Sequence, residues 1–133
     1  MCRLLTLVGA SAFLLAQPLD AQGTLVVSQN KCESGRLPEL RRMTDSLFIP
    51  IAQELVNEGK FSAVGSAYHA WGDEWNVVQW YTARDIPTFL SAWGELIQRV
   101  NQRHPRFMTQ IQTWCTEHKD SFYSQGRATA PPG

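Results

Sequence analysis

The chain has 133 residues, a formal net charge of zero at neutral pH, and 44% hydrophobic and 11% aromatic residues. This length predicts one domain. The charge balance argues against a dedicated nucleic-acid binder, which usually carries a basic excess. The sequence also has no run of like charges that would suit an anionic membrane surface.

The N-terminal segment has the layout of a secretory signal peptide. Arg3 gives a basic start, the apolar run LLTLVGASAFLLA follows, Pro18 ends the run, and Ala21 offers a small residue for cleavage. The run is too short for a stable membrane anchor, which needs roughly 20 residues. We therefore predict a signal peptide over residues 1–21 and a secreted or periplasmic mature protein with no membrane insertion. The alternative is an uncleaved amphipathic start.

Export bears on the two cysteines that cleavage would leave, Cys32 and Cys115. Two cysteines in an oxidising compartment usually pair, and this bridge would close most of the chain into one loop. The chain-entropy model gives such a loop about 4–5 kcal/mol of stabilisation as an upper figure. The alternative is a reactive thiol at Cys115 near His118, for which no second partner is evident.

The folded domain is predicted over residues 22–125, and β-branched residues favour a first strand at 24–31. A helix should follow, kinked at Pro50 because proline lacks an amide donor, and capped at its C-terminal end by Gly59. The apolar stripe of this helix recurs at three and four positions: Leu40, Met43, Leu47, Ile51 and Leu55.

Two strands are predicted next, at 61–70 and 74–82. Small residues share one face of the first, which would let a helix approach that face closely: Ala63, Gly65 and Ala67.

The C-terminal part is predicted to be mostly helical. Asp85 is a good N-cap for a helix that ends near His104, and a short helix over 106–115 follows. A last short strand is expected at 120–124, before a disordered tail over 126–133.

This order of elements predicts an α+β, ferredoxin-like βαββαβ fold, with an antiparallel sheet, helices on one face and an extra short C-terminal helix. The stretches EGKFSAVGSAYH and YTARDIPTFLSAW resemble the dimeric α+β barrel superfamily, which includes antibiotic-biosynthesis-type monooxygenases and stress-responsive barrel proteins. The resemblance covers about residues 24–103. It implies a homodimer whose two sheets pair face to face, and a pocket between sheet and helices. Some members are cofactor-free oxygenases, and some bind haem.

The stretch HAWGDEWN, residues 69–76, has two interpretations. The glycine and aspartate at 72–73 favour a hairpin tip flanked by aromatic cross-strand pairs. Alternatively, the stretch walls a cleft for a planar ligand, because tryptophan offers flat apolar area with one donor. His69 could then act as a general base, if a carboxylate orients it. The candidate ligand-binding residues are His69, Trp71, Asp73, Trp75, Asn76 and Trp80.

Metal and cofactor sites find less support. The side chains of His69, His104 and His118, with Asp73 or Glu117, would be chemically adequate for zinc, but their spacing matches no ligand motif. No haem-binding motif surrounds His104, which suits a helix C-terminus instead. We therefore expect no metal and no cofactor.

Two functions remain open at this stage. The first is an exported domain that binds a small apolar or aromatic molecule, or a protein partner. The second is a cofactor-independent monooxygenase-like enzyme, by analogy with the superfamily, and fold analogy alone is a weak argument for chemistry. We favour the first, because no catalytic set of residues converges in the sequence.

Overall fold

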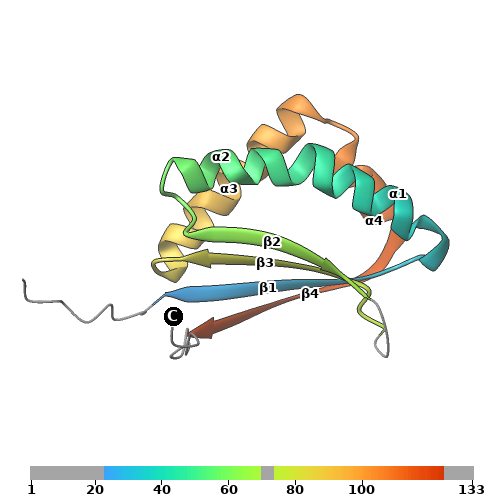
Figure 1. Cartoon of the computed structure of the whole chain (residues 1–133), viewed down its shortest axis with the longest axis horizontal. Helices are drawn as coiled ribbons and strands as arrows, with labels where there is room; N and C mark the ends of the chain where they lie inside the picture. Colours follow the sequence, from blue (N-terminus) through green and yellow to red (C-terminus); the bar gives the residue numbers. More distant parts are fainter. Residues whose placement is uncertain (1–22, 70–73, 125–133) are drawn as a thin grey trace, which may run out of the picture.

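The computed structural model describes residues 23–69 and 74–124. The predicted signal peptide, the predicted tail and the tip of the aromatic hairpin lie outside these residues. Four antiparallel strands form a sheet in the order β2-β3-β1-β4, and helices cover one of its faces (Figure 1). The α+β ferredoxin-like fold predicted from the sequence is confirmed.

The strands are β1 (Thr24–Cys32), β2 (Ala63–Tyr68), β3 (Val77–Ala83) and β4 (Cys115–Ser124). The central strand β1 places Val26 opposite Tyr81 of β3 and opposite Phe122 of β4. Because side chains alternate between the two faces of a strand, this register also decides which side chains meet the helices.

The helical layer begins with a short 3-10 turn, η1 (Ser34–Arg36), and continues through α1 (Leu37–Met43), η2 (Thr44–Phe48) and α2 (Ile49–Asn57). Two helices follow β3, namely α3 (Ile86–Arg103) and α4 (Phe107–Trp114). Among the described helices, none combines the length and the apolar character that crossing a bilayer requires.

The segment η2 is a π-helical turn, and it takes the place of the kink predicted at Pro50. Pro50 has no amide to donate one turn back. The amide of Ile49 bonds instead to the carbonyl of Thr44, five residues earlier. The helix then ends as the sequence predicts, with Gly59 in the left-handed region at a φ of 74°.

Helix α3 begins at the predicted cap. The carboxylate of Asp85 accepts a hydrogen bond from the amide of Thr88 at 2.8 Å. Hydrogen bonds from the Thr88 side chain and amide hold the pKa of Asp85 below its usual value. At the other end, the amide of His104 donates to the Val100 carbonyl at 2.7 Å, so His104 is the C-cap residue.

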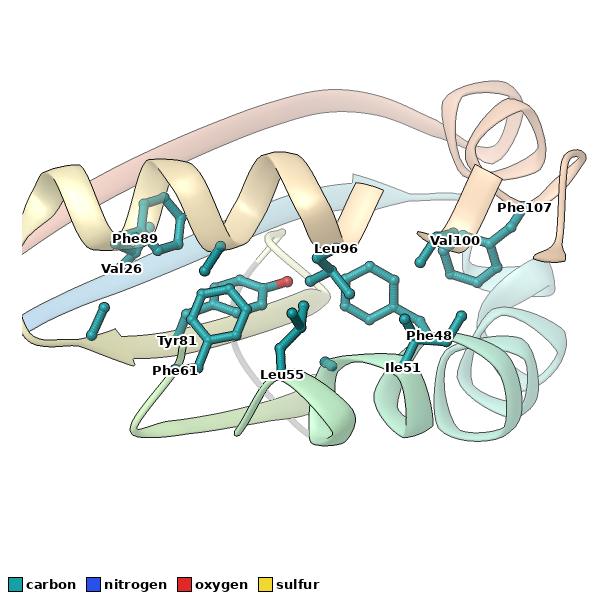
Figure 2. Packing of buried hydrophobic residues seen from close by; sticks show 13 residues of the cluster. Val26, Phe48, Ile51, Leu55, Phe61, Tyr81, Phe89, Leu96, Val100 and Phe107 are labelled. Atoms are coloured by element: carbon teal, nitrogen blue, oxygen red, sulfur yellow. The ribbon is translucent and has the colours of Figure 1, made fainter. Parts of the chain in front are cut away.

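Aromatic rings make up much of the core between sheet and helices (Figure 2). Tyr81, 1% exposed, lies with its ring centre 5.6 Å from that of Phe61 and 5.9 Å from that of Phe89. Phe48 stacks on Phe107 at 5.6 Å. Phe61, predicted to begin a strand, lies before β2 and points into this core.

The last strand is longer than predicted. It begins at Cys115 rather than at residue 120 and pairs with β1 along its length. The sequence CTEHKD looks like a loop because it is polar. At the edge of a sheet, however, an exposed strand carries polar side chains without penalty, and here the backbone pairing is set by β1.

The prediction for the small residues of β2 is also wrong. Their register places Ala63, Gly65 and Ala67 on the face of the sheet that no described helix covers. The absence of a side chain at Gly65 leaves space for the indole ring of Trp80, and not for a helix. A Cβ atom there would lie 2.4 Å from the indole ring of Trp80.

The predicted disulfide is present. The sulfur atoms of Cys32 and Cys115 lie 2.02 Å apart and join the end of β1 to the start of β4. The bridge therefore holds the junction at which α4 ends and β4 begins.

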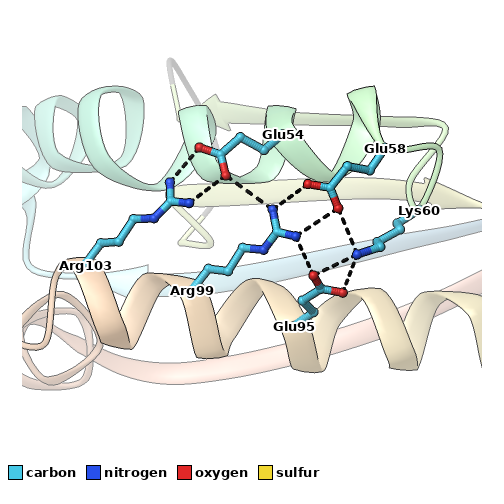
Figure 3. Close-up of polar contacts among 6 residues, drawn as sticks. All are labelled: Glu54, Glu58, Lys60, Glu95, Arg99 and Arg103. Carbon is cyan, nitrogen blue, oxygen red and sulfur yellow. Dashed lines mark hydrogen bonds and ion pairs between the residues drawn. The ribbon is translucent and has the colours of Figure 1, made fainter.

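An ion-pair network joins α2 to α3 on the outer surface of the helical layer (Figure 3). Arg99 bonds bidentately to Glu58, at 2.7 and 2.9 Å, and this contact is the main cause that lowers the pKa of Glu58 from 4.5 to about 2. Six side chains take part: Glu54, Glu58, Lys60, Glu95, Arg99 and Arg103.

Candidate functional site

A cavity of about 270 Å³ lies between the covered face of the sheet and the helical layer. Its residues come from β1, β3 and β4 on one side, and from α1, η2, α3 and α4 on the other. The lining consists of Ser28, Asn30, Leu40, Thr44, Phe48, Val77, Gln79, Trp93, Met108, Ile111, Gln112, Cys115 and His118.

The helical side of the cavity is mainly apolar, with Thr44 and Gln112 as its polar residues. It includes Leu40, Phe48, Trp93, Met108 and Ile111. An apolar cavity of about 150 Å³ can hold benzene. The volume here therefore suits a molecule of one or two rings.

The sheet side of the cavity is polar. The covered face of β1 begins with the apolar Val26 and continues with two hydrophilic residues. Ser28 and Asn30 are 3% and 8% exposed, on the same face as the core residue Val26. Gln79 lies opposite Ser28 on β3 and is 7% exposed. Such residues need hydrogen-bond partners, since a buried polar group without one costs free energy.

His118 and Asp120 on β4 provide partners for this polar side. The hydroxyl of Ser28 donates to Asp120 Oδ1 at 2.5 Å. The Nδ1 atom of His118 lies 2.9 Å from Asn30 Oδ1, and its Nε2 atom lies 3.1 Å from Asp120 Oδ2. The ring of His118 is thus held from both nitrogen atoms beside the cavity.

Tyr81 and Gln79 extend the polar contacts into the core. The phenol of Tyr81 donates to Gln79 Oε1 at 3.2 Å. Complete burial, with the charge of Asp120 as a second cause, raises the pKa of Tyr81 well above its ordinary value. Tyr81 therefore stays neutral at physiological pH and acts as a donor.

Thr44 differs from the other polar lining residues. Its side chain is fully buried, and Oγ1 has no hydrogen-bond partner among the described residues. The hydroxyl of Tyr68 lies close to it and donates to Asp45 Oδ1 at 3.3 Å.

The six ligand-binding candidates predicted from the hairpin sequence do not come together at this cavity in the described structure. Trp71 and Asp73 lie outside the described residues. None of the four that are described lines the cavity. His69 is exposed just after β2, and its amide donates to the Asn76 carbonyl at 3.0 Å. The side chain of Asn76 binds the backbone of Cys32, at 2.9 Å through Oδ1 and 2.7 Å through Nδ2.

Trp75 and Trp80 lie on the other face of the sheet. Trp80 packs on Gly65, and Trp75 lies 4.5 Å beneath the ammonium group of Lys119. We call this side the open face. Its apolar residues are Leu25, Val27, Ala63, Ala67, Val78, Trp80 and Tyr123.

The sequence suggested His118 as a metal ligand or as the neighbour of a reactive Cys115 thiol, and it gave no prediction for Ser28, Asn30, Thr44 or Asp120. A signal was available in β1, where hydrophilic residues occupy the positions that continue the buried face of Val26. Among the described residues, no group of three or more histidine, cysteine, aspartate or glutamate side chains is placed to hold a metal ion.

The comparisons with known proteins give structural likeness only. No protein-family model matches the chain, and no curated protein matches it. A NIPSNAP family protein of unknown function from Agrobacterium tumefaciens superposes with a TM-score of 0.66 at 13% identity, covering 83% of this chain and 94% of its own.

Two other solved structures are informative. A dimeric ferredoxin-like protein from an uncultured marine organism has a TM-score of 0.64 at 4% identity, with 83% of this chain and 92% of that chain covered. SnoaB, a cofactor-independent oxygenase from Streptomyces nogalater, has a TM-score of 0.54 at 14% identity, covering 84% and 100%. At these identities the likeness shows a shared fold.

Proposed function

We propose that this chain is an exported, homodimeric domain that binds a small uncharged molecule, mainly apolar, in the cavity between sheet and helices. The observation that carries the proposal is the cavity itself, which has a mainly apolar helical side and a hydrogen-bonding sheet side.

The lining favours a neutral ligand. The described lining residues include no lysine, arginine, aspartate or glutamate. An ionised ligand without an opposite charge would lose its hydration at a large cost. A ring system with one or two polar substituents matches both sides of the cavity.

Two features support export. The N-terminal sequence has the layout of a signal peptide, and a disulfide such as Cys32–Cys115 persists in oxidising compartments. Intact-mass measurement on the exported fraction, with alkylation before and after reduction, tests both points. We expect cleavage near Ala21 and no free thiol. An intact N-terminus or two alkylated cysteines would argue against export.

The open face supports a homodimer. Its central residues, Val27 and Trp80, lie opposite each other on β1 and β3 and are only partly buried. Contiguous apolar surface of this kind marks an interaction site, and a twofold axis would cover it symmetrically. The likeness to a dimeric ferredoxin-like protein agrees with this arrangement. In it, Trp75 and Trp80 of the hairpin region serve the interface.

A cofactor-independent oxygenase is the second candidate. It is favoured by His118, which lies at the cavity with a carboxylate on its Nε2 atom to orient the ring. His118 would act as a general base through Nδ1, after that atom exchanges its contact with Asn30 for the substrate. The likeness to SnoaB is consistent with it. Oxygen uptake with dihydroxynaphthalenes, lost in His118→Gln, would support the enzyme. If oxygen uptake is no faster with the protein than without it, the oxygenase function is ruled out.

Calorimetric titration with 2-naphthol and 2-methylnaphthalene tests the binding proposal. Ile111→Trp fills the cavity from α4, whereas Thr113→Trp adds the same ring on the exposed side of that helix. We expect the wild type and Thr113→Trp to bind, and Ile111→Trp, once shown to be folded by its melting curve, not to bind. The absence of binding to either probe, or unchanged binding by Ile111→Trp, would overturn the proposal.

A further inference from the structure

The hydroxyl of Thr44 points to the chemical class of the ligand, on the condition that the cavity binds one as proposed above. It belongs to a fully buried side chain in the cavity lining. A buried hydroxyl that has no partner costs about 1–3 kcal/mol. A protein that keeps such a group carries a cost that a bound molecule can remove.

The local helix geometry places Thr44 on the cavity side of the helical layer. Thr44 and Phe48 are the first and last residues of the π-helical turn, and both line the cavity. Residues four apart lie on nearly the same face of a helix, so Thr44 and Phe48 both lie on the cavity side of the turn. Such π turns are frequent at functional sites.

The other buried polar residues of the lining have partners within the protein. Ser28 bonds to Asp120, Asn30 bonds to His118, and Gln79 accepts from Tyr81. Among the described residues, Thr44 Oγ1 is the buried side-chain polar atom left without a hydrogen bond. It can both donate and accept, so it suits a hydroxyl or a carbonyl oxygen.

We propose that Thr44 is the specificity-determining residue of the cavity, and that the ligand is an uncharged one- or two-ring molecule with a hydroxyl or carbonyl oxygen. That oxygen bonds to Thr44 Oγ1, while the ring lies against Phe48 and Trp93, whose ring centres are 6.5 Å apart. The described lining has no lysine or arginine to pair with a carboxylate, and Asp120 already occupies Nε2 of His118, so the corresponding carboxylate should bind more weakly.

Three probes of one size separate these contributions: 2-naphthol, 2-methylnaphthalene and 2-naphthoate. We expect the wild type to prefer 2-naphthol over 2-methylnaphthalene by about fivefold to tenfold, as one hydrogen bond implies. The affinity for 2-naphthoate should be the weakest of the three. Thr44→Val should abolish the preference and Thr44→Ser should keep it.

Thr113→Val is the matched control, because it makes the same substitution at an exposed site on α4. It should leave the preference unchanged. If both neutral probes bind and Thr44→Val retains the preference for 2-naphthol, the proposal for Thr44 is wrong while the binding function stands. Equal affinity of the wild type for the two neutral probes would also overturn it. Failure of both neutral probes to bind would overturn the binding function itself.

Discussion

The side-chain amide of Asn76 binds the backbone of Cys32 with both of its groups. Asn76 Oδ1 accepts from the Cys32 amide at 2.9 Å, and Nδ2 donates to the Cys32 carbonyl at 2.7 Å. Asn76 is 7% exposed and Cys32 6%, so water cannot readily replace these bonds. These two bonds hold the residue just before β3 against Cys32, whose disulfide joins β1 to β4.

Asn76→Ala should therefore destabilise the fold. It leaves a buried amide and a buried carbonyl of Cys32 unpaired, which we expect to cost about 2–4 kcal/mol. Urea unfolding with the disulfide intact measures the change. Asn101→Ala, at an exposed position of α3, is the control and should cost far less. A loss below about 0.5 kcal/mol for Asn76→Ala would show that the two bonds contribute little.

Thr44→Val should stabilise the ligand-free protein. The substitution replaces an unpartnered buried hydroxyl by a methyl group of similar shape, and the expected gain is about 1 kcal/mol in the free energy of unfolding. Thermal and urea unfolding of Thr44→Val, beside Thr113→Val, check it. A clear loss of stability in Thr44→Val would mean that the hydroxyl is satisfied in the folded protein.

Glu58 should make the protein sensitive to acid. Its pKa is lowered from 4.5 to about 2, chiefly by its hydrogen bonds to Arg99 and then to Lys60. A depressed pKa contributes stability that is fully present above pH 4.5 and is lost as the pH falls toward 2. Glu58→Gln should therefore show a shallower decline in unfolding free energy over that window. High salt should narrow the difference, because these pairs are exposed. Parallel declines in the two proteins would contradict this assignment.

Val27→Lys should prevent the proposed homodimer from forming. The substitution places a charge at the middle of the open face, opposite Trp80. Light scattering at micromolar concentration should give about twice the monomer mass for the wild type and the monomer mass for the variant. Gln53→Lys on the exposed side of α2 should leave the dimer intact. A monomeric wild type would contradict the homodimer.

The fold was largely predictable because its main determinants are local. The apolar stripe from Leu40 to Leu55, the Asp85 cap and the Gly59 terminator each follow from short-range patterns. The start of β4 was not predictable in this way. Its polar residues become a strand because β1 and the disulfide hold them there, which is tertiary information.

The site was less predictable because its parts meet only in the folded chain. Asp120 is 92 residues from Ser28, and His118 is 88 from Asn30. Tryptophans drew attention to the hairpin, yet Trp80 packs on the opposite face of the sheet from the cavity. Aromatic content marks apolar surface, but it does not distinguish a ligand cavity from an interface between subunits.

Chemical-shift mapping with 2-naphthol tests the central claim most directly. Amide spectra of the isotope-labelled protein should show the largest shifts at residues around the cavity, including Thr44, Ile111 and His118. The changes should saturate, and they should be absent in Ile111→Trp. Shifts confined to the open face around Val27 and Lys119, or no shift at saturating probe, would contradict a ligand site between sheet and helices.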